Sequence, residues 1–184
     1  DVSFTLMGLA GIDHPFQHDI MCEKLREKGL KNFEIYNDGF LGVKAGSETG
    51  AAIGYNMGTG MCCNAIDRKG EMRQLAGLGE FSGDIGGGHQ IAITAYRIIY
   101  DDVMLDIEKT AMTHMFFEEF GLKTKEDFLA TVAMYEDEEQ LPRFVMRLLD
   151  FFFEAANMGD KPVMRAVEAL ADRGAYLIAA HANQ

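Results

Sequence analysis

The chain has 184 residues, which is enough for one large domain or two small ones and for a substantial buried core. Its 17 basic and 29 acidic residues give a formal net charge of −12, and such a surface repels nucleic-acid phosphates and anionic membranes. A nucleotide remains compatible with this charge, because Mg²⁺ and backbone amides can screen its phosphates locally.

The three cysteines have no CxxC spacing, which argues against a disulfide framework and favours a reducing compartment. Cys62 and Cys63 are adjacent, and neighbours on a strand point to opposite faces, so two small core residues are favoured over a redox pair or metal ligands. No apolar run reaches the roughly 18 residues that span a bilayer, and no signal peptide is recognised. We therefore expect a cytoplasmic protein with no membrane or nucleic-acid partner.

The N-terminal stretch predicts a strand, a helix and a second strand. Val2–Ile12 is mostly apolar and short enough for a buried strand of a parallel sheet. Asp13 is expected to be the helix N-cap, with Pro15 in the first turn and Gly29 at the end. Asn32–Asp38 predicts the second strand, which completes a βαβ unit. Ligands gather at the carboxyl ends of such strands, the edge that would carry the acidic residues at positions 13 and 38.

Beyond a short helix over 39–47, the pattern changes to tight glycine turns. The segments 50–58, 59–67 and 72–80 predict an antiparallel meander. From Ile85 onward apolar residues recur at helical spacing, and the segments are separated by glycines and acidic turns. We expect helices over 89–102, 109–121, 124–136, 139–159 and 161–182. The change of pattern suggests a domain boundary near residues 45–50.

Two glycine-rich stretches could hold an anion. The turn Gly58-Thr59-Gly60 would leave backbone N–H groups bare for a phosphate, although a tight hairpin uses the same residues. In "GDIGGGHQ", Asp84 is a candidate helix N-cap, and the helix N-terminus is a candidate anion site. Three glycines there cost conformational entropy that a plain cap does not require. We expect another group to approach this backbone closely.

These stretches, taken in order, carry a resemblance. "GLAGIDHP", "YND", "GTG" and "AGLGEFSGDIGGG", followed by "AANMGDKPVMRAVEALADRGAYL", resemble the N-acetylglucosamine kinase and benzoyl-CoA-reductase-activator ATPase family of the actin-like ATPase and sugar kinase superfamily. The resemblance implies an α/β, ribonuclease-H-like actin/sugar-kinase fold, present in part. Residues 1–46 would end the first domain with its βαβ unit. Residues 47–184 would form the second domain, antiparallel hairpins plus helices, without its final strands.

The same resemblance implies that the chain is an internal fragment. The family opens with a "DGGGT"-type phosphate-binding hairpin and ends with a strand and a "GG" turn that hold adenosine, and neither motif occurs in the sequence. We therefore expect the isolated chain to be inactive, and the complete protein to be an ATP-dependent kinase of an N-acetylhexosamine such as N-acetylglucosamine, using Mg²⁺.

The resemblance also assigns roles to individual residues. Asp38 would be the catalytic base that accepts the proton of the sugar hydroxyl. The second phosphate loop would be Gly58, Thr59 and Gly60. The sugar would be bound or its pocket shaped by Asn37, Asp84, Gly77, Gly79 and Gly83. For Asp13 the resemblance leaves metal, substrate and capping roles open.

Two departures from the family pattern concern the acceptor. Met61 follows the "GTG" turn where a small polar residue is usual, and Ile85 follows "GD" where an acid is usual. A carboxylate that could tune the substrate or metal is therefore missing, and the identity of the sugar is open.

Two alternative functions accompany the kinase interpretation. An activator-type ATPase would hold an iron–sulfur cluster between subunits, but Cys62 and Cys63 lie on the wrong element for cluster ligands. A non-catalytic ligand-binding domain could use the same fold. The Met- and Phe-rich helices are interpreted as core, with a homodimer face left open. His14 and His18, four residues apart, lack a third ligand, so no metal site is assigned to the protein itself.

Overall fold

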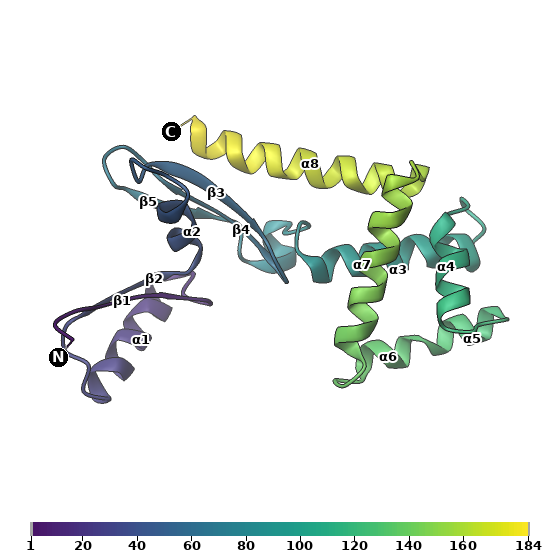
Figure 1. Cartoon of the computed structure of the whole chain (residues 1–184), viewed down its shortest axis with the longest axis horizontal. Coiled ribbons are helices and arrows are strands. Elements are labelled where there is room, and N and C mark those ends of the chain that lie inside the picture. The colour runs from purple at the N-terminus through teal and green to yellow at the C-terminus, as the bar shows by residue number, and fades with distance from the viewer. Residues whose placement is uncertain (1, 184) are drawn as a thin grey trace. The chain divides into compact units, whose positions relative to one another are not determined.

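A computed structural model describes residues 2–183, with the side chain of Glu80 excluded. Its N-terminal part is a strand–helix–strand unit. The strands β1 (Thr5–Leu9) and β2 (Phe33–Asn37) pair in parallel, and α1 (Pro15–Glu27) connects them. Their carboxyl ends are level, because Leu9 pairs with Asn37. The predicted βαβ unit is confirmed (Figure 1).

The start of α1 differs from the expectation in one residue. His14, not Asp13, is the N-cap: its backbone is extended, and the side chain of Gln17 returns to accept a hydrogen bond from the His14 N–H at 2.8 Å. Pro15 lies in the first turn, as predicted. Gly29 follows the helix at a φ of 91°, the left-handed conformation that glycine adopts without steric cost. Because His14 takes the cap position, the Asp13 carboxylate is available for other contacts.

The middle of the chain is a three-stranded sheet in the order β3-β4-β5, preceded by the short helix α2 (Gly39–Ala45). The strands are β3 (Ala52–Met57), β4 (Met61–Ile66) and β5 (Met72–Leu75). β4 and β5 pair antiparallel, and residues 58–60 connect β3 to β4 (Figure 1). The three predicted strands are therefore present, each shorter than its apolar segment.

A single 3₁₀ turn, η1 (Gly79–Ser82), leads into the helical remainder. The helices are α3 (Gly88–Val103), α4 (Ala111–Glu119), α5 (Lys125–Ala130), α6 (Val132–Glu136), α7 (Leu141–Asn157) and α8 (Lys161–Ala182). The segment expected as one helix over 124–136 is broken at Thr131, whose hydroxyl donates to the Phe128 carbonyl at 2.7 Å. This local bond competes with continuation of the helix, as threonine hydroxyls commonly do.

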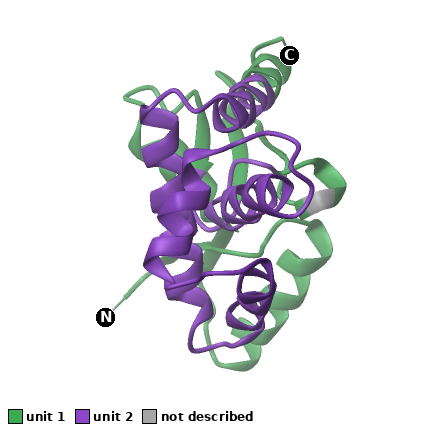
Figure 2. Cartoon of the chain, turned by 90° about the vertical axis from the view of Figure 1, so that its right-hand side faces the viewer, with its two compact units in different colours: residues 1–56, 61–84, 175–184 green, residues 57–60, 85–174 purple. Residues whose placement is uncertain are grey.

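The chain divides into two compact units, coloured in Figure 2. We call residues 1–56, 61–84 and 175–184 the sheet unit, and residues 57–60 and 85–174 the helical unit. The boundary between these units does not lie between residues 46 and 47, where the two domains were predicted to meet. The strands β1 and β2 belong to the same unit as β4 and β5. The assignment of 1–46 and 47–184 to two ribonuclease-H-like domains stays a prediction.

The helical unit has an aromatic core. Phe116, Phe128 and Phe152 are fully buried. The Phe128 ring stacks on Tyr96 with centroids 5.0 Å apart and meets the edge of Phe116 at 5.7 Å. The prediction that the Met- and Phe-rich helices form core is confirmed for these side chains. Phe153, by contrast, is 53% exposed.

The sheet unit has two smaller apolar clusters. One contains Ile12, Cys22 and Ile35 between α1 and the parallel strands. The other contains Met61, Cys63 and Leu177, and beside it His181 Nε2 lies 3.1 Å from the Cys63 carbonyl oxygen. Met61, the departure in the "GTG" motif, is therefore a core residue. Among the described residues, no helix is long and apolar enough to cross a membrane.

Candidate functional site

A carboxylate held by two amide side chains lies at the ends of the parallel strands. Asp13 Oδ1 accepts a hydrogen bond from Asn37 Nδ2 at 3.0 Å and another from Gln74 Nε2 at 2.7 Å. The three residues come from the loop after β1, the end of β2 and β5. Bonds from two partners fix the carboxylate orientation, and charge-assisted bonds of this kind are stronger than neutral ones.

Asn37 is oriented from its other end as well. Its Oδ1 accepts from the backbone N–H of Gly39 at 2.9 Å and from Asn64 Nδ2 at 3.4 Å. Asn37 is 6% exposed and Asn64 is fully buried. The Asn64 Oδ1 atom has no hydrogen-bond partner among the described residues. A side chain at Gly39 would come within 2.6 Å of that oxygen, so glycine is needed for the close approach of α2 to β4.

An open cavity of about 440 Å³ borders this network in the sheet unit. Asp13, Asn37 and Gln74 line it together with His14, the N-cap of α1, and Tyr36 of β2. Polar groups that converge on one cavity are typical of a ligand site.

Asp38 follows Asn37 directly and is exposed. It is the N-cap residue of α2 by position, but its side chain makes no cap hydrogen bond. Within residues 2–183 no hydrogen bond or ion pair engages its carboxylate. The backbone at this point is held by the Asn37 side chain, which accepts from the Gly39 N–H, while the Asp38 carboxylate next to it is exposed.

The pKa of the Cys62 thiol on β4 is raised by burial and, in part, by nearby carboxylates. Burial raises its pKa above the ordinary value; a hydrogen bond from Asn56 opposes this, and the nearby carboxylates of Asp38, Asp13 and Asp84 raise it further. A thiol in such surroundings stays protonated and weakly nucleophilic. Cys63, its neighbour, is fully buried in the cluster with Met61 and Leu177, whereas the Cys62 sulfur lies near Asn56, so the expectation of a core residue is confirmed for Cys63.

Asp84 is not a helix N-cap, because α3 begins four residues later with Gly87 as its N-cap. The Asp84 carboxylate is 7% exposed and turned into the loop before it. Its Oδ2 accepts from the N–H groups of Gly77 at 2.9 Å and Gly79 at 2.8 Å, and its Oδ1 accepts from Ser82 Oγ at 2.8 Å. Asp84 thus organises the turn.

The glycines of this turn are required by conformation and space. Gly77, Gly79 and Gly83 all have positive φ, between 64° and 92°. A side chain at Gly77 would come within 2.7 Å of Gln74 Nε2, the group that binds Asp13. The predicted residues of the "AGLGEFSGD" stretch and the Asp13 network therefore meet in the sheet unit.

The hairpin turn of residues 58–60 packs on the start of α3 within the helical unit. Gly88 N–H donates to the Gly58 carbonyl at 2.8 Å, and His89 N–H donates to the Thr59 carbonyl at 3.2 Å. A side chain at Gly87 would lie 2.6 Å from Gly60 Cα. The expected close approach is confirmed, and the approaching group is the hairpin backbone. Carbonyl oxygens occupy the first amides of α3, so the candidate anion site at this helix N-terminus is not supported.

The turn itself retains two amide donors. Gly58 N–H bonds to the Gly60 carbonyl at 2.9 Å, whereas the N–H groups of Thr59 and Gly60 donate no hydrogen bond to any described residue. Both residues are exposed. Exposed neighbouring amides without a Cβ at Gly60 can contact a phosphate closely.

Two members of the network were missed from the sequence. Asn64 stands in the otherwise apolar strand "MCCNAI", and a polar residue in a buried strand is a usable signal of a functional or hydrogen-bonded role. Gln74 in "MRQL" has no such signal, since its role depends on a partner 61 positions away.

His14 and His18 border the same cavity but have separate roles. His14 caps α1, and His18 contacts Asp19 and the Cys22 sulfur. Among residues 2–183, no group of three or more His, Cys, Asp or Glu side chains is placed to hold a metal ion. The three cysteines are free thiols.

Comparisons with known proteins found similarity in sequence and in structure. No family model matches the chain. The chain is 26% identical over 130 residues to the N-acetylmuramic acid/N-acetylglucosamine kinase of Clostridium acetobutylicum, which covers 70% of this chain and 42% of that protein. The structure of this chain matches that of a candidate N-acetylglucosamine kinase from Chromobacterium violaceum with a TM-score of 0.67 and 20% identity. The match covers 94% of this chain and 57% of that one.

The chain thus spans about two-fifths of the curated relative and somewhat more than half of the solved structure. The structural likeness, at this identity, concerns the fold: the chain has an α/β architecture that resembles that of a candidate sugar kinase.

Proposed function

We propose that the complete protein is an ATP-dependent sugar kinase that phosphorylates an N-acetylhexosamine such as N-acetylglucosamine. The observation that carries the proposal is the exposed carboxylate of Asp38, which has no partner among the described side chains. It follows Asn37, whose side chain has three hydrogen-bonded neighbours. A catalytic base must be positioned by its surroundings and yet free to accept a proton. The sequence similarity to an N-acetylmuramic acid/N-acetylglucosamine kinase supports the substrate class.

In this mechanism Asp38 accepts the proton of the sugar hydroxyl as that oxygen bonds to the γ-phosphorus of ATP. The bond between the γ-phosphorus and the bridging oxygen breaks, and ADP leaves. Such phosphoryl transfer depends mainly on positioning and on stabilisation of the phosphate charge. The exposed amides of Thr59 and Gly60 are the groups that we assign to a nucleotide phosphate.

The sugar side of the reaction would use the network of the sheet unit. The Asn37 amide and the Asp84 carboxylate are the proposed partners of sugar hydroxyls. Each carboxylate oxygen of Asp84 already accepts hydrogen bonds, and a carboxylate has about four acceptor sites, so capacity remains. Gly77, Gly79 and Gly83 would let the backbone of that turn approach the sugar.

Mg²⁺ would arrive with the nucleotide. Magnesium in kinases is held mostly by phosphates and water, with one or two carboxylates, which is compatible with the lack of a preformed three-ligand cluster in the described residues. Of the roles left open for Asp13, we propose contact with this nucleotide-borne ion, since the neighbouring amides engage only one of the two carboxylate oxygens. When bound, the ion would neutralise charge on the transferring phosphoryl group.

The test is the Asp38→Asn variant of the complete protein, assayed for ADP release with ATP, Mg²⁺ and N-acetylglucosamine. We expect turnover to fall by about 10²-fold or more, because the general base is lost, while sugar binding measured by calorimetry is retained. The control is Glu48→Gln, which neutralises an exposed carboxylate in the same unit away from the network.

Unchanged turnover of Asp38→Asn would remove Asp38 from the base role. Sugar binding by the wild-type protein without any ADP release would instead support the alternative of a non-catalytic ligand-binding domain.

A further inference from the structure

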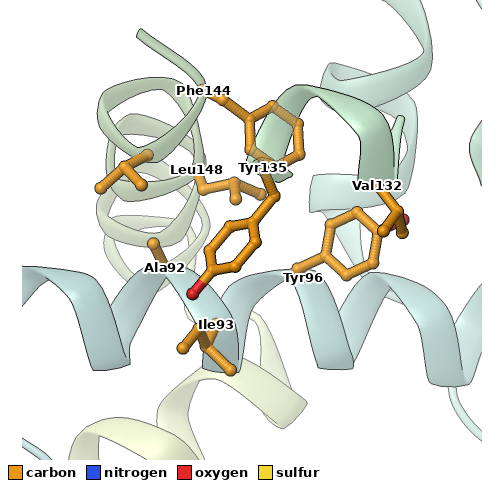
Figure 3. Close-up of a pocket in the computed structure, with 8 residues that line it drawn as sticks. Ala92, Ile93, Tyr96, Val132, Tyr135, Phe144 and Leu148 are labelled. Atoms are coloured by element: carbon orange, nitrogen blue, oxygen red, sulfur yellow. The ribbon is translucent and has the colours of Figure 1, made fainter. Parts of the chain in front are cut away.

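The helical unit contains a second cavity, of about 260 Å³, between α3 and the α6–α7 segment (Figure 3). Its lining consists of aliphatic and aromatic side chains, which are Ala92, Ile93, Tyr96, Val132, Tyr135, Phe144, Val145 and Leu148. All of them belong to one compact unit. None of the residues assigned to the proposed kinase chemistry lines this cavity.

The interior of the cavity is apolar and deep. Ala92, Phe144 and Leu148 are 1%, 3% and 2% exposed, and Figure 3 shows them between the α3 and α7 ribbons. No charged side chain is among the described lining residues. A cavity lined by apolar groups offers water few hydrogen-bond partners, so an apolar ligand that enters it displaces only weakly held water.

The two hydroxyl groups of the lining are already engaged. Tyr96 Oη lies 3.3 Å from the Phe128 carbonyl, to which it donates, and 3.2 Å from the Thr131 hydroxyl. Tyr135 Oη lies 2.8 Å from His89 Nε2. A sugar, a phosphate or a carboxylate in this cavity would therefore lose its hydration without gaining hydrogen bonds, which is costly.

The opening lies along α6. None of the five residues of this short helix is buried. Val132 and Tyr135 line the cavity and are still 42% and 37% exposed. The apolar lining is thus continuous from the buried floor to the surface, and a ligand can reach the floor past these two side chains.

We propose that this cavity binds a small, uncharged aromatic molecule of about the size of a two-ring system. A dry cavity of about 150 Å³ accepts one benzene ring, so the larger volume here suits a fused pair of rings. The rings of Tyr96, Tyr135 and Phe144 offer faces and edges for aromatic packing. One compact cavity of this size, open at one short helix, does not have the extended shape that a peptide strand or helix requires.

Indole is the probe for the test. The chain contains no tryptophan, so none of its side chains carries the indole fluorophore that is followed in the titration. We expect saturable binding of one indole per chain, with emission shifted to shorter wavelength as the ring enters the apolar interior. Indole-3-acetate, which adds a carboxylate, is expected to bind at least about tenfold more weakly.

The first variant is Ala92→Leu, which fills the floor of the cavity. We expect indole binding to weaken by at least about tenfold while the far-ultraviolet circular dichroism spectrum and the cooperative melting transition are kept. If Ala92→Leu does not fold, Val132→Gln tests the proposal in its place, because residue 132 lies at the exposed opening and tolerates a polar side chain. This variant should weaken binding by about threefold or more.

Leu129→Gln is the matched control, since Leu129 is also 42% exposed but does not line the cavity. It should bind indole as the wild type does. The proposal is overturned if the wild type shows no saturable binding, if indole-3-acetate binds as well as indole, or if the folded cavity variants bind indole unchanged.

Discussion

The sheet unit and the helical unit use different interactions in their centres. The sheet unit has two small apolar clusters and, between its strands, a hydrogen-bonded network of Asp13, Asn37, Asn64 and Gln74. The helical unit has a single large cluster dominated by aromatic rings. Polar networks fix orientation, whereas apolar packing supplies most of the stability. The centre of the sheet unit is therefore held partly by directed hydrogen bonds, and that of the helical unit mainly by aromatic packing.

The largest expected effect comes from the aromatic core. Phe128→Ala removes a fully buried ring that contacts Tyr96 and Phe116. We expect the free energy of unfolding of the helical unit to fall by about 3–5 kcal/mol, since the cavity left behind adds to the lost burial. Urea denaturation measures it. Phe153→Ala, at a ring that is 53% exposed, is the control and should cost less than about 1 kcal/mol. Equal losses would contradict the assignment of the core.

A smaller effect is expected where the hairpin meets α3. Gly87 has a φ of −78°, which alanine can adopt, but a Cβ there would lie 2.6 Å from Gly60 Cα and 2.7 Å from the Thr59 carbonyl. Gly87→Ala must therefore displace the turn of residues 58–60, at a cost of about 1–3 kcal/mol. The measurement is the thermal unfolding midpoint, with amide NMR shifts of the turn as a local probe.

Gly58→Ala is the paired variant, because no atom lies within 4 Å of a Cβ at that position. Its unfolding midpoint should stay close to that of the wild type. A destabilisation as large as that of Gly87→Ala would show that the close contact with α3 does not explain the glycine at position 87.

The smallest effect concerns a buried carboxylate of the helical unit. Burial works against the charged form of Asp102, but hydrogen bonds from Thr113 at 2.6 Å, from Lys109 and from Thr110 outweigh it, so the pKa is lowered below its ordinary value. A lowered pKa in the folded state stabilises the fold above the unfolded-state pKa of about 3.9, and this contribution is lost as pH falls through the folded-state pKa.

We therefore expect the wild type to lose stability on acidification below about pH 4, and the stability difference between wild type and Asp102→Asn to shrink over that range. Thermal melts between neutral pH and about pH 3 measure it. Asp106→Asn is the control, because the Asp106 side chain is 76% exposed and solvent screens its pairing with Lys109. A constant difference between wild type and Asp102→Asn at all pH values would contradict the assignment.

Much of the local structure was predictable from the sequence. The parallel strand pair, the short α2 helix, the three strands of the meander and the helical remainder follow from apolar periodicity and from glycine positions such as Gly29. The helix boundaries were less predictable. Asp13 was predicted as the N-cap of α1, but the N-cap is His14, whose backbone N–H donates to the Gln17 side chain. The break at Thr131 depends on a side-chain bond that competes with the helix.

The candidate site was predictable only in part. The sequence marked Asp38, Asn37 and the glycine-rich turns through a pattern of short motifs. For Asp84 it left a helix cap and a substrate role open, and the structure removes the cap, because Gly87 is the N-cap of α3. The roles assigned to these residues in sugar and nucleotide binding stay predictions. Gln74 could not be found, because its hydrogen bond to Asp13 joins segments far apart in the chain.

The order and type of the elements follow from local sequence, because strand and helix periodicities involve only neighbouring residues. Which polar groups meet depends on the tertiary structure. It brought Asn64 to Asn37 and Asn37 to Asp13, and it directed the first amides of α3 to the hairpin carbonyls and away from an anion. Such contacts depend on the packing of distant segments, and a buried polar group takes whichever partner that packing supplies.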